Sequence, residues 1–197
     1  MSSTIAQDCS RHSGSSNLVA DSSETTGLKW QAPAGSDKTF TLISTTTLST
    51  GSPTSITISG LNYDEIIVQV VEARTNANAD EYFIDPTCGT TTNSRQTELE
   101  RITTGNMLGQ QRNSARVSIG GNAANTSNVH CFFHYRGCKS TSRKQVFAVG
   151  GSETTGSFTQ GGVISGFIEA TAALTAITFS TNGGGAFTNG TMYVYGA

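Results

Sequence analysis

From residue 40 onward the apolar residues of this chain occur in short runs that alternate with polar residues, and this period of two limits the possible folds most. Residues 55–59 place two isoleucines between small polar residues, and residues 174–180 repeat the pattern with leucine, alanine, isoleucine and phenylalanine in a longer run. Successive side chains of a strand point to opposite faces, so such runs fit half-buried β-strands. Serine, threonine and glycine separate the runs. The sequence therefore predicts an all-β protein.

The same pattern predicts about eight strands. They are expected near residues 39–43, 55–59, 63–71, 129–136, 144–149, 162–170, 174–180 and 191–196. Eight short strands without helices favour an antiparallel β-sandwich over residues 37–197, most simply a jelly roll, with the strand order left open. The strands at 129–136 and 144–149 are expected to form a hairpin with a turn at Gly137.

The segments between these strands carry turn chemistry. Residues 74–97 are polar and include Asp85-Pro86 and Cys88-Gly89, and residues 95–102 are the best candidate for helical or irregular structure. The glycine runs at 120–121, 150–151, 161–162 and 183–185 are interpreted as turns between strands that need positive φ, and not as phosphate-binding loops.

Residues 1–36 differ from the rest of the chain. They are polar, rich in serine, threonine and glycine, and hold one apolar cluster with Leu28 and Trp30. No period persists there, and Ala32-Pro33-Ala34-Gly35 closes the segment. We predict an extended N-terminal arm that orders against a partner, for docking or trimerisation, with Leu28 and Trp30 as its contacts. An equally weighted alternative is that Trp30 packs against the chain's own domain.

Composition excludes several classes of function. The formal net charge is −2, 13% of the residues are charged, and no basic cluster is present, so nucleic-acid binding is not expected. The first residues lack the pattern of a secretory signal, and no apolar run reaches the length that crosses a bilayer, so synthesis in a cytosol without membrane insertion is expected. Cys9, Cys88, Cys131 and Cys138 are irregularly spaced, so structural disulfides are not expected, although a Cys131–Cys138 bridge across a hairpin stays open.

Carboxylate pairs give no convincing catalytic site. Asp64 and Glu65 are adjacent on a predicted strand and therefore point to opposite faces. Glu98 and Glu100 have arginines beside them, which favours a solvated, ion-paired edge. No nucleophile motif or phosphate loop is present.

The densest group of metal-binding residue types is His130, Cys131, His134 and Cys138. In a strand the two histidines are about 13 Å apart and Cys131 points to the other face. Zinc ligands must converge at about 2.0–2.3 Å. We expect neither a metal nor another cofactor, and no enzyme activity.

Three segments resemble bacteriophage tail-fibre and virion structural proteins. Residues 18–34 resemble the pattern ADSxxTGLKWxxPA, which precedes the distal domain in that group. Residues 165–179 and 183–197 match its C-terminal patterns, the last ending in GTxxxYG, although Ala197 replaces a terminal isoleucine. The resemblance implies a homotrimer whose arm wraps the threefold axis and a strand core of Ile66, Ile67, Val68, Val70 and Val71.

The resemblance implies a virion protein that is made in the host cytoplasm. The leading hypothesis is a fibre-type module whose arm contacts other virion proteins and whose loops bind a host receptor such as surface polysaccharide. Exposed rings and amides would make that contact. The candidates are Tyr82, Phe83, Asn106, Asn122, Asn125 and Asn128, with a core position the alternative for Tyr82 and Phe83. A capsid decoration or head-fibre protein without receptor binding is the second hypothesis. A polysaccharide-degrading enzyme using Asp85 and Glu169 is the third.

Overall fold

The chain divides into two compact units, Met1–Thr39 and Phe40–Ala197. The computed structural model describes residues 17–20, 28–31, 39–51, 53–77, 82–89, 91–101, 107–112, 117–119, 127–154 and 157–197, and for the strands β1, β2, β7 and β8 it gives the backbone pairing.

The described part of the first unit is a two-stranded hairpin. Strand β1 (Asn17–Ala20) pairs antiparallel with β2 (Leu28–Gln31), so that Leu18 lies opposite Trp30. Both predicted docking residues, Leu28 and Trp30, are therefore in β2. The docking or trimerisation role of residues 1–36 stays a prediction.

The second unit contains twelve strands in its described residues and no helix among them. They are β3 (Thr41–Thr47), β4 (Ser55–Ser59), β5 (Glu65–Thr75), β6 (Tyr82–Thr87), β7 (Thr91–Arg101), β8 (Met107–Arg112), β9 (Val117–Ile119), β10 (Asn128–Arg136), β11 (Arg143–Thr154), β12 (Ser157–Ala170), β13 (Ala176–Thr181) and β14 (Phe187–Gly196). The predicted all-β class is confirmed, and each of the eight predicted strands overlaps an observed one.

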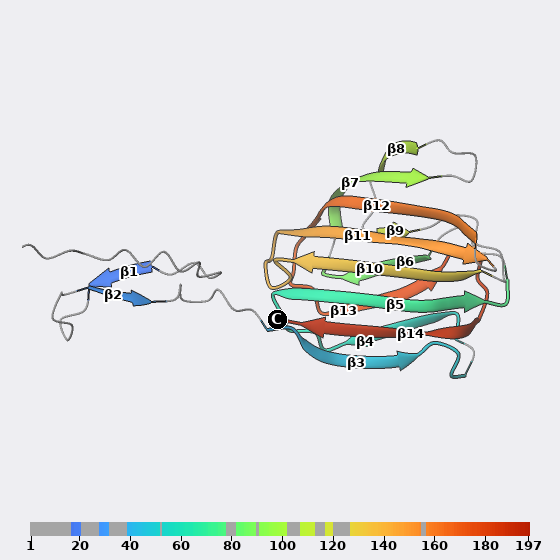
Figure 1. Ribbon diagram of the computed structural model, residues 1–197, viewed down its shortest axis with the longest axis horizontal. Helices are drawn as coiled ribbons and strands as arrows, with labels where there is room; N and C mark the ends of the chain where they lie inside the picture. Colours follow the sequence, from blue (N-terminus) through green and yellow to red (C-terminus); the bar gives the residue numbers. More distant parts are fainter. Residues whose placement is uncertain are drawn as a thin grey trace, which may run out of the picture. The chain divides into compact units, whose positions relative to one another are not determined.

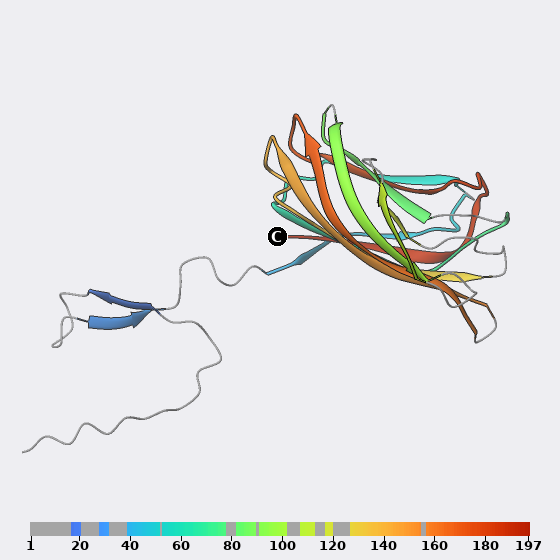
Figure 2. The ribbon, with the colours of Figure 1, turned by 90° about the horizontal axis from the view of Figure 1, so that it is seen from above.

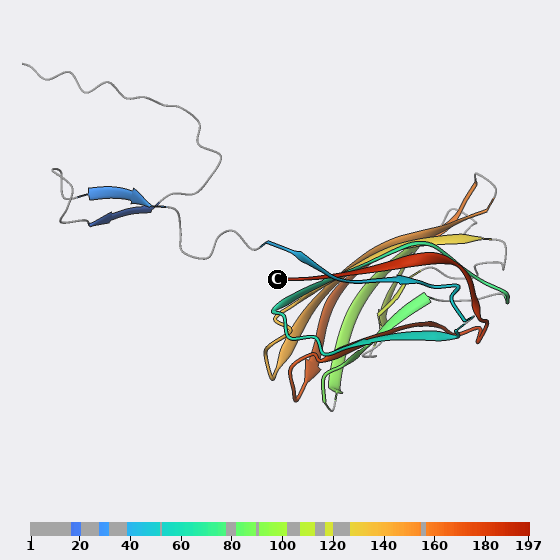
Figure 3. The same cartoon turned by 90° about the horizontal axis from the view of Figure 1, so that it is seen from below.

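Two antiparallel sheets face each other as a sandwich. The large sheet has the order β3-β14-β5-β10-β11-β12-β7-β8, and the small sheet has the order β4-β13-β6-β9. Figure 1 shows the large sheet in front of the small one, and Figures 2 and 3 show how strongly its strands curve.

Eight of these strands follow the path of a jelly roll. Strands β3, β4, β5 and β6 alternate between the two sheets, and they pair with β14, β13, β10 and β9, respectively. The chain thus behaves as one long hairpin of four strand pairs that is rolled into two four-stranded sheets, which is the jelly-roll arrangement. The predicted jelly-roll-like sandwich is confirmed.

The four remaining strands are two inserted hairpins that widen only the large sheet. The β7–β8 hairpin follows β6, and the β11–β12 hairpin follows β10. Strand β11 pairs with β10, and β12 pairs with β7, so that both hairpins extend the same edge of the jelly roll. The inserted β11–β12 hairpin widens the large sheet and also contributes to the core, through buried residues such as Val146 and Ile164.

The core lies between the sheets and follows the period of two. In β10 the residues Val129, Cys131, Phe133 and Tyr135 are buried, whereas the residues between them are less buried or exposed. Other buried side chains come from both sheets: Ile66, Val68, Val70, Ile164, Ile168, Ile84, Ile177 and Phe179. Of the five β5 residues expected in the core, Ile67 and Val71 are only half-buried, because they point away from the small sheet.

Three expectations about the middle of the chain were wrong. Residues 95–101, expected to be helical or irregular, belong to strand β7. Asp85-Pro86, expected to be a turn, lies inside β6, where Pro86 pairs with Ile177. The glycines at 150–151 and 161–162 lie inside β11 and β12 and have no positive φ. In the run 183–185 between β13 and β14 only Gly184 has positive φ, of +66, and the run 120–121 lies outside the described residues.

The C-terminus is part of the sheet. Strand β14 runs between β3 and β5, and the amides of Asp64 and Glu65 donate to the carbonyl oxygen of Ala197. The chain therefore ends inside the large sheet, as the alternating residues 191–196 predicted.

Candidate functional site

Two of the predicted receptor residues lie in the core. Tyr82 and Phe83 of β6 are 1% and 3% exposed, and the Tyr82 ring stacks on Phe179 at a centroid distance of 6.1 Å. Their prediction as exposed loop residues was wrong, because they belong to strand β6 although the segment around them is polar. Neither ring is available to a ligand, and the alternative core position is confirmed.

The asparagine candidates are not brought together by the described structure. Asn128 begins β10 opposite Glu153 and is half-buried, and its Oδ1 is buried without a hydrogen-bond partner among the described residues. Asn106, Asn122 and Asn125 lie outside the described residues.

The outer face of the large sheet offers a better candidate, over strands β10, β11 and β12. An antiparallel sheet that covers a core on one side normally presents polar residues on the other. Here Phe147, Val149 and Val163 are 44%, 39% and 40% exposed. Val149 lies directly opposite Val163 on one side and Phe132 on the other, so an apolar row crosses three strands. Exposed apolar patches of this kind mark binding surfaces.

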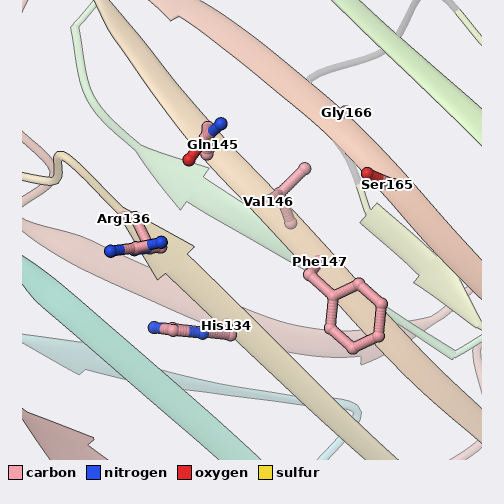
Figure 4. Close-up of a pocket in the computed structure, with 7 residues that line it drawn as sticks. All are labelled: His134, Arg136, Gln145, Val146, Phe147, Ser165 and Gly166. Atoms are coloured by element: carbon pink, nitrogen blue, oxygen red, sulfur yellow. The ribbon is translucent and has the colours of Figure 1, made fainter.

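A hollow of about 230 Å³ lies beside this row. Figure 4 shows that His134 and Arg136 come from β10, Gln145 and Phe147 from β11, and Ser165 from β12. Val146 and Gly166, which lie opposite each other, complete the lining. We call this hollow the β10–β12 hollow.

A buried carboxylate holds the basic residues of the hollow. Glu65 Oε2 lies 2.9 Å from Nε2 of His134, and Glu65 Oε1 lies 3.5 Å from Nε of Arg136. The Glu65 side chain is 8% exposed and that of Arg136 is 59% exposed. The Phe40 ring meets the His134 ring edge-on at 5.9 Å. The carboxylate thus lies beneath the donors and fixes them, and it is the positive guanidinium that faces solvent.

A second hollow of about 320 Å³ lies on the same sheet, over β5, β10 and β11. Its lining includes His130, Phe132 and Val149, together with the glycine pair 150–151. Gly150 and Gly151 lie opposite Gly162 and Gly161, so two adjoining cross-strand pairs carry no side chains. Gly150 and Gly151 line this hollow, whereas Gly161 and Gly162 do not.

The geometry does not assemble the catalytic pair considered from the sequence. Glu169 is on β12 of the large sheet, and its Oε1 accepts a hydrogen bond of 2.7 Å from Arg143 Nη2. Asp85 is on β6 of the small sheet. Carboxylates that share a substrate must converge on it, and these two start from different sheets.

The histidine and cysteine cluster is spread over both faces of β10. Cys131 is buried in the core, while His130 is exposed on the outer face, where its Nε2 lies 3.7 Å from Glu153 Oε1. The described residues contain no group of three or more His, Cys, Asp or Glu side chains that could hold a metal.

The sequence contains a signal for an outer face that is not purely polar. In residues 129–136 and 144–149, large side chains occur at the positions that face the core and also at the alternate positions that face outward. Phe132 and Phe147 are at outward positions, where polar residues are expected. Aromatic rings on both faces of a strand indicate either that both faces of the sheet are buried or that the outer face binds a partner. Glu65, Arg136, Gln145 and Ser165 gave no signal of their own.

Comparison of the chain with known protein families, curated proteins and solved structures gives no match. In the described part of the chain we find no helix with the length and apolar character that crossing a membrane requires.

Proposed function

We propose that the chain is a bacteriophage virion structural protein, a fibre-type module of the particle surface that attaches to a host receptor glycan and has no catalytic role. The observation that carries the proposal is where the three segments that resemble phage fibre proteins fall. Residues 18–34 contain the β1–β2 hairpin except Asn17, and residues 165–179 and 183–197 contain the end of β12, most of β13 and all of β14. The resemblance therefore spans both units.

The architecture supports a binding role on a particle. Jelly rolls occur in viral capsid and lectin domains, where the closed core leaves loops and outer faces free for contacts. A fold alone does not define a function, so the argument rests on the site. The site here is an exposed apolar row with polar neighbours, which runs from β10 across the inserted β11–β12 hairpin.

The two units suggest a division of labour. In the proposal the Met1–Thr39 unit contacts other virion proteins and holds a homotrimer together, and the Phe40–Ala197 unit displays the binding face. Light scattering on the full-length chain should give three times its mass of 20.6 kDa. Deletion of residues 1–36 should reduce that mass to one chain; a monomer in both forms would refute the trimer.

The location on the particle is tested by immunogold electron microscopy. Purified particles from the host that makes the chain are labelled with an antibody against it, and their proteins are identified by mass spectrometry. Label at the tail tip supports the fibre module, and label over the shell supports a decoration protein instead. Particles that contain none of the chain would refute both.

A further inference from the structure

The β10–β12 hollow combines an apolar ring with polar groups around it. The Phe147 ring is exposed on one wall, while the Arg136 guanidinium, the Gln145 amide and the Ser165 hydroxyl come from the surrounding strands. Small-molecule sites have this composition, with apolar contact area and a few polar groups that fix the orientation. A pyranose ring fits such a site, because one of its faces is lined by C–H groups and its rim by hydroxyls.

The size of the hollow favours a single ring. The hollow has a volume of about 230 Å³, below the range of about 300–1,000 Å³ that is usual for sites of drug-sized ligands. That space suits one sugar unit of a longer polymer, whose neighbours would extend along the open face of the sheet.

The charge of the hollow favours an acidic ligand. Glu65 is nearly inaccessible beneath His134 and Arg136, so the accessible charge is the Arg136 guanidinium. Glu169, a further carboxylate among the described residues of β12, is engaged by Arg143 at 2.7 Å. Guanidinium groups bind carboxylates through two parallel hydrogen bonds, and Glu65 restrains the Arg136 side chain from below.

The donors are also held in place before a ligand arrives. His134 and Arg136 share the Glu65 carboxylate, and all the lining residues lie on paired strands of the sheet. Groups fixed on strands lose less conformational entropy on binding than groups on loops.

We propose that the β10–β12 hollow binds a carboxylate-bearing pyranose of an acidic polysaccharide. The sugar ring lies against Phe147, its carboxylate pairs with Arg136, and Gln145 and Ser165 hydrogen-bond to its hydroxyls. This inference rests on the proposed function, since it names the class of glycan and moves the receptor site from the loops to the outer face of the large sheet.

The test uses the full-length chain and nuclear magnetic resonance titrations with digalacturonate, a mannuronate dimer and sialyllactose, each paired with its methyl ester. At least one acid should shift signals of residues around the hollow at about 1 mM. Its ester should bind about tenfold more weakly or worse, because the charge-assisted hydrogen bonds to Arg136 are lost.

Variants assign the binding to the hollow. Arg136→Gln should remove the preference for the acid over its ester, and Phe147→Ala should weaken both ligands about equally. Lys139→Gln is the matched control: it removes the same charge from an exposed turn that does not line the hollow and should change neither affinity. Spectra of the free proteins show that each variant is folded.

Two results would overturn the inference. One is the lack of any response to all three acids at millimolar concentration. The other is an acid preference that survives in Arg136→Gln or is lost equally in Lys139→Gln. Immunogold label on the particle together with either result would leave the proposed virion location standing and refute only the acidic-glycan site.

Discussion

Replacing Lys144 by methionine should destabilise the Phe40–Ala197 unit by about 3 kcal/mol. Lys144 is the first core-facing residue of β11 and is fully buried. Its Nζ donates hydrogen bonds to the carbonyl oxygens of Ser140 at 2.6 Å, Ala172 at 2.7 Å and Ser142 at 3.2 Å. These carbonyls precede β11 and follow β12, so the ammonium ties together the two ends of the inserted hairpin.

The magnitude follows from the acceptors that would lose their donor. The carbonyl of Ser142 also accepts the amide of Ala170 at 3.2 Å, so two carbonyls, those of Ser140 and Ala172, carry most of the effect. A part-buried group that loses its partner costs about 1–3 kcal/mol, and bonds to a charged donor are at the upper end. Methionine keeps the length of the aliphatic stem, which limits the cavity contribution. About 3 kcal/mol corresponds to a decrease in Tm of roughly 6–12 °C for a unit of this size.

Urea unfolding, followed by the far-ultraviolet circular dichroism of the backbone, measures this change in stability. The midpoint should fall with the m-value unchanged. Lys139→Met is the control, because Lys139 is exposed in the turn before β11 and its replacement should change stability by less than about 0.5 kcal/mol. A Lys144→Met effect below about 1 kcal/mol, or an equal effect in the control, would refute the account of the buried ammonium.

Three further predictions concern thiol, hydroxyl and backbone. Burial raises the pKa of the Cys138 thiol to about 12 from 9.0, so iodoacetamide should alkylate it about a thousandfold more slowly in the folded protein than in urea, as mass spectrometry can measure. Above pH 9 the unfolded Cys138 thiol ionises while the folded one stays protonated, so this thiol should lower stability by up to about 1.4 kcal/mol per pH unit until about pH 12. Cys138→Ala should make the fall of stability with pH less steep, and a slope should remain because burial also raises the pKa of Cys131 and of Tyr135. Tyr135 has a buried hydroxyl without a hydrogen-bond partner among the described residues, so Tyr135→Phe should leave urea stability unchanged or raise it by about 1 kcal/mol; a loss above 1 kcal/mol would show a hidden partner. Gly190 has φ +110, and a Cβ added there would lie 2.7 Å from Ala73 Cα, so Gly190→Ala should lower the free energy of unfolding by about 3 kcal/mol or more. Gly60 has φ +74 but open space around it, so Gly60→Ala should lower it by only about 1 kcal/mol. Equal losses of stability in thermal melts of the two variants would contradict the steric argument.

Much of the strand content could be predicted because the signal is local. Residues 55–59 are strand β4 without any change of bounds, and the hairpin around Gly137 forms as expected, with φ +70 at the glycine. In these segments the alternation and the turn residue agree with the final structure. The signal failed in β6 and β7, where proline, threonine and charged residues outweighed the few apolar ones.

The candidate site was missed for a different reason. Glu65 was predicted only to point away from Asp64, and the sheet places its carboxylate against His134 and Arg136 of the neighbouring strand. Those residues are about 70 positions apart in the chain. Only the pairing of β5 with β10 brings them within hydrogen-bond distance.

The sequence by itself determined that this chain forms alternating, half-buried strands whose inward residues can close an antiparallel sandwich, because the period of two is written in neighbouring residues. The tertiary structure decided which strands are partners, and with that the jelly-roll path, the two hairpins that extend it, and the face where Arg136 and Phe147 meet. It also decided that Lys144 is buried and Phe147 exposed, against the ordinary preference of each. The reason is that exposure depends on which segments cover a strand, and strand pairing over long separations is set by the packing of the whole core and not by the residues of either strand alone.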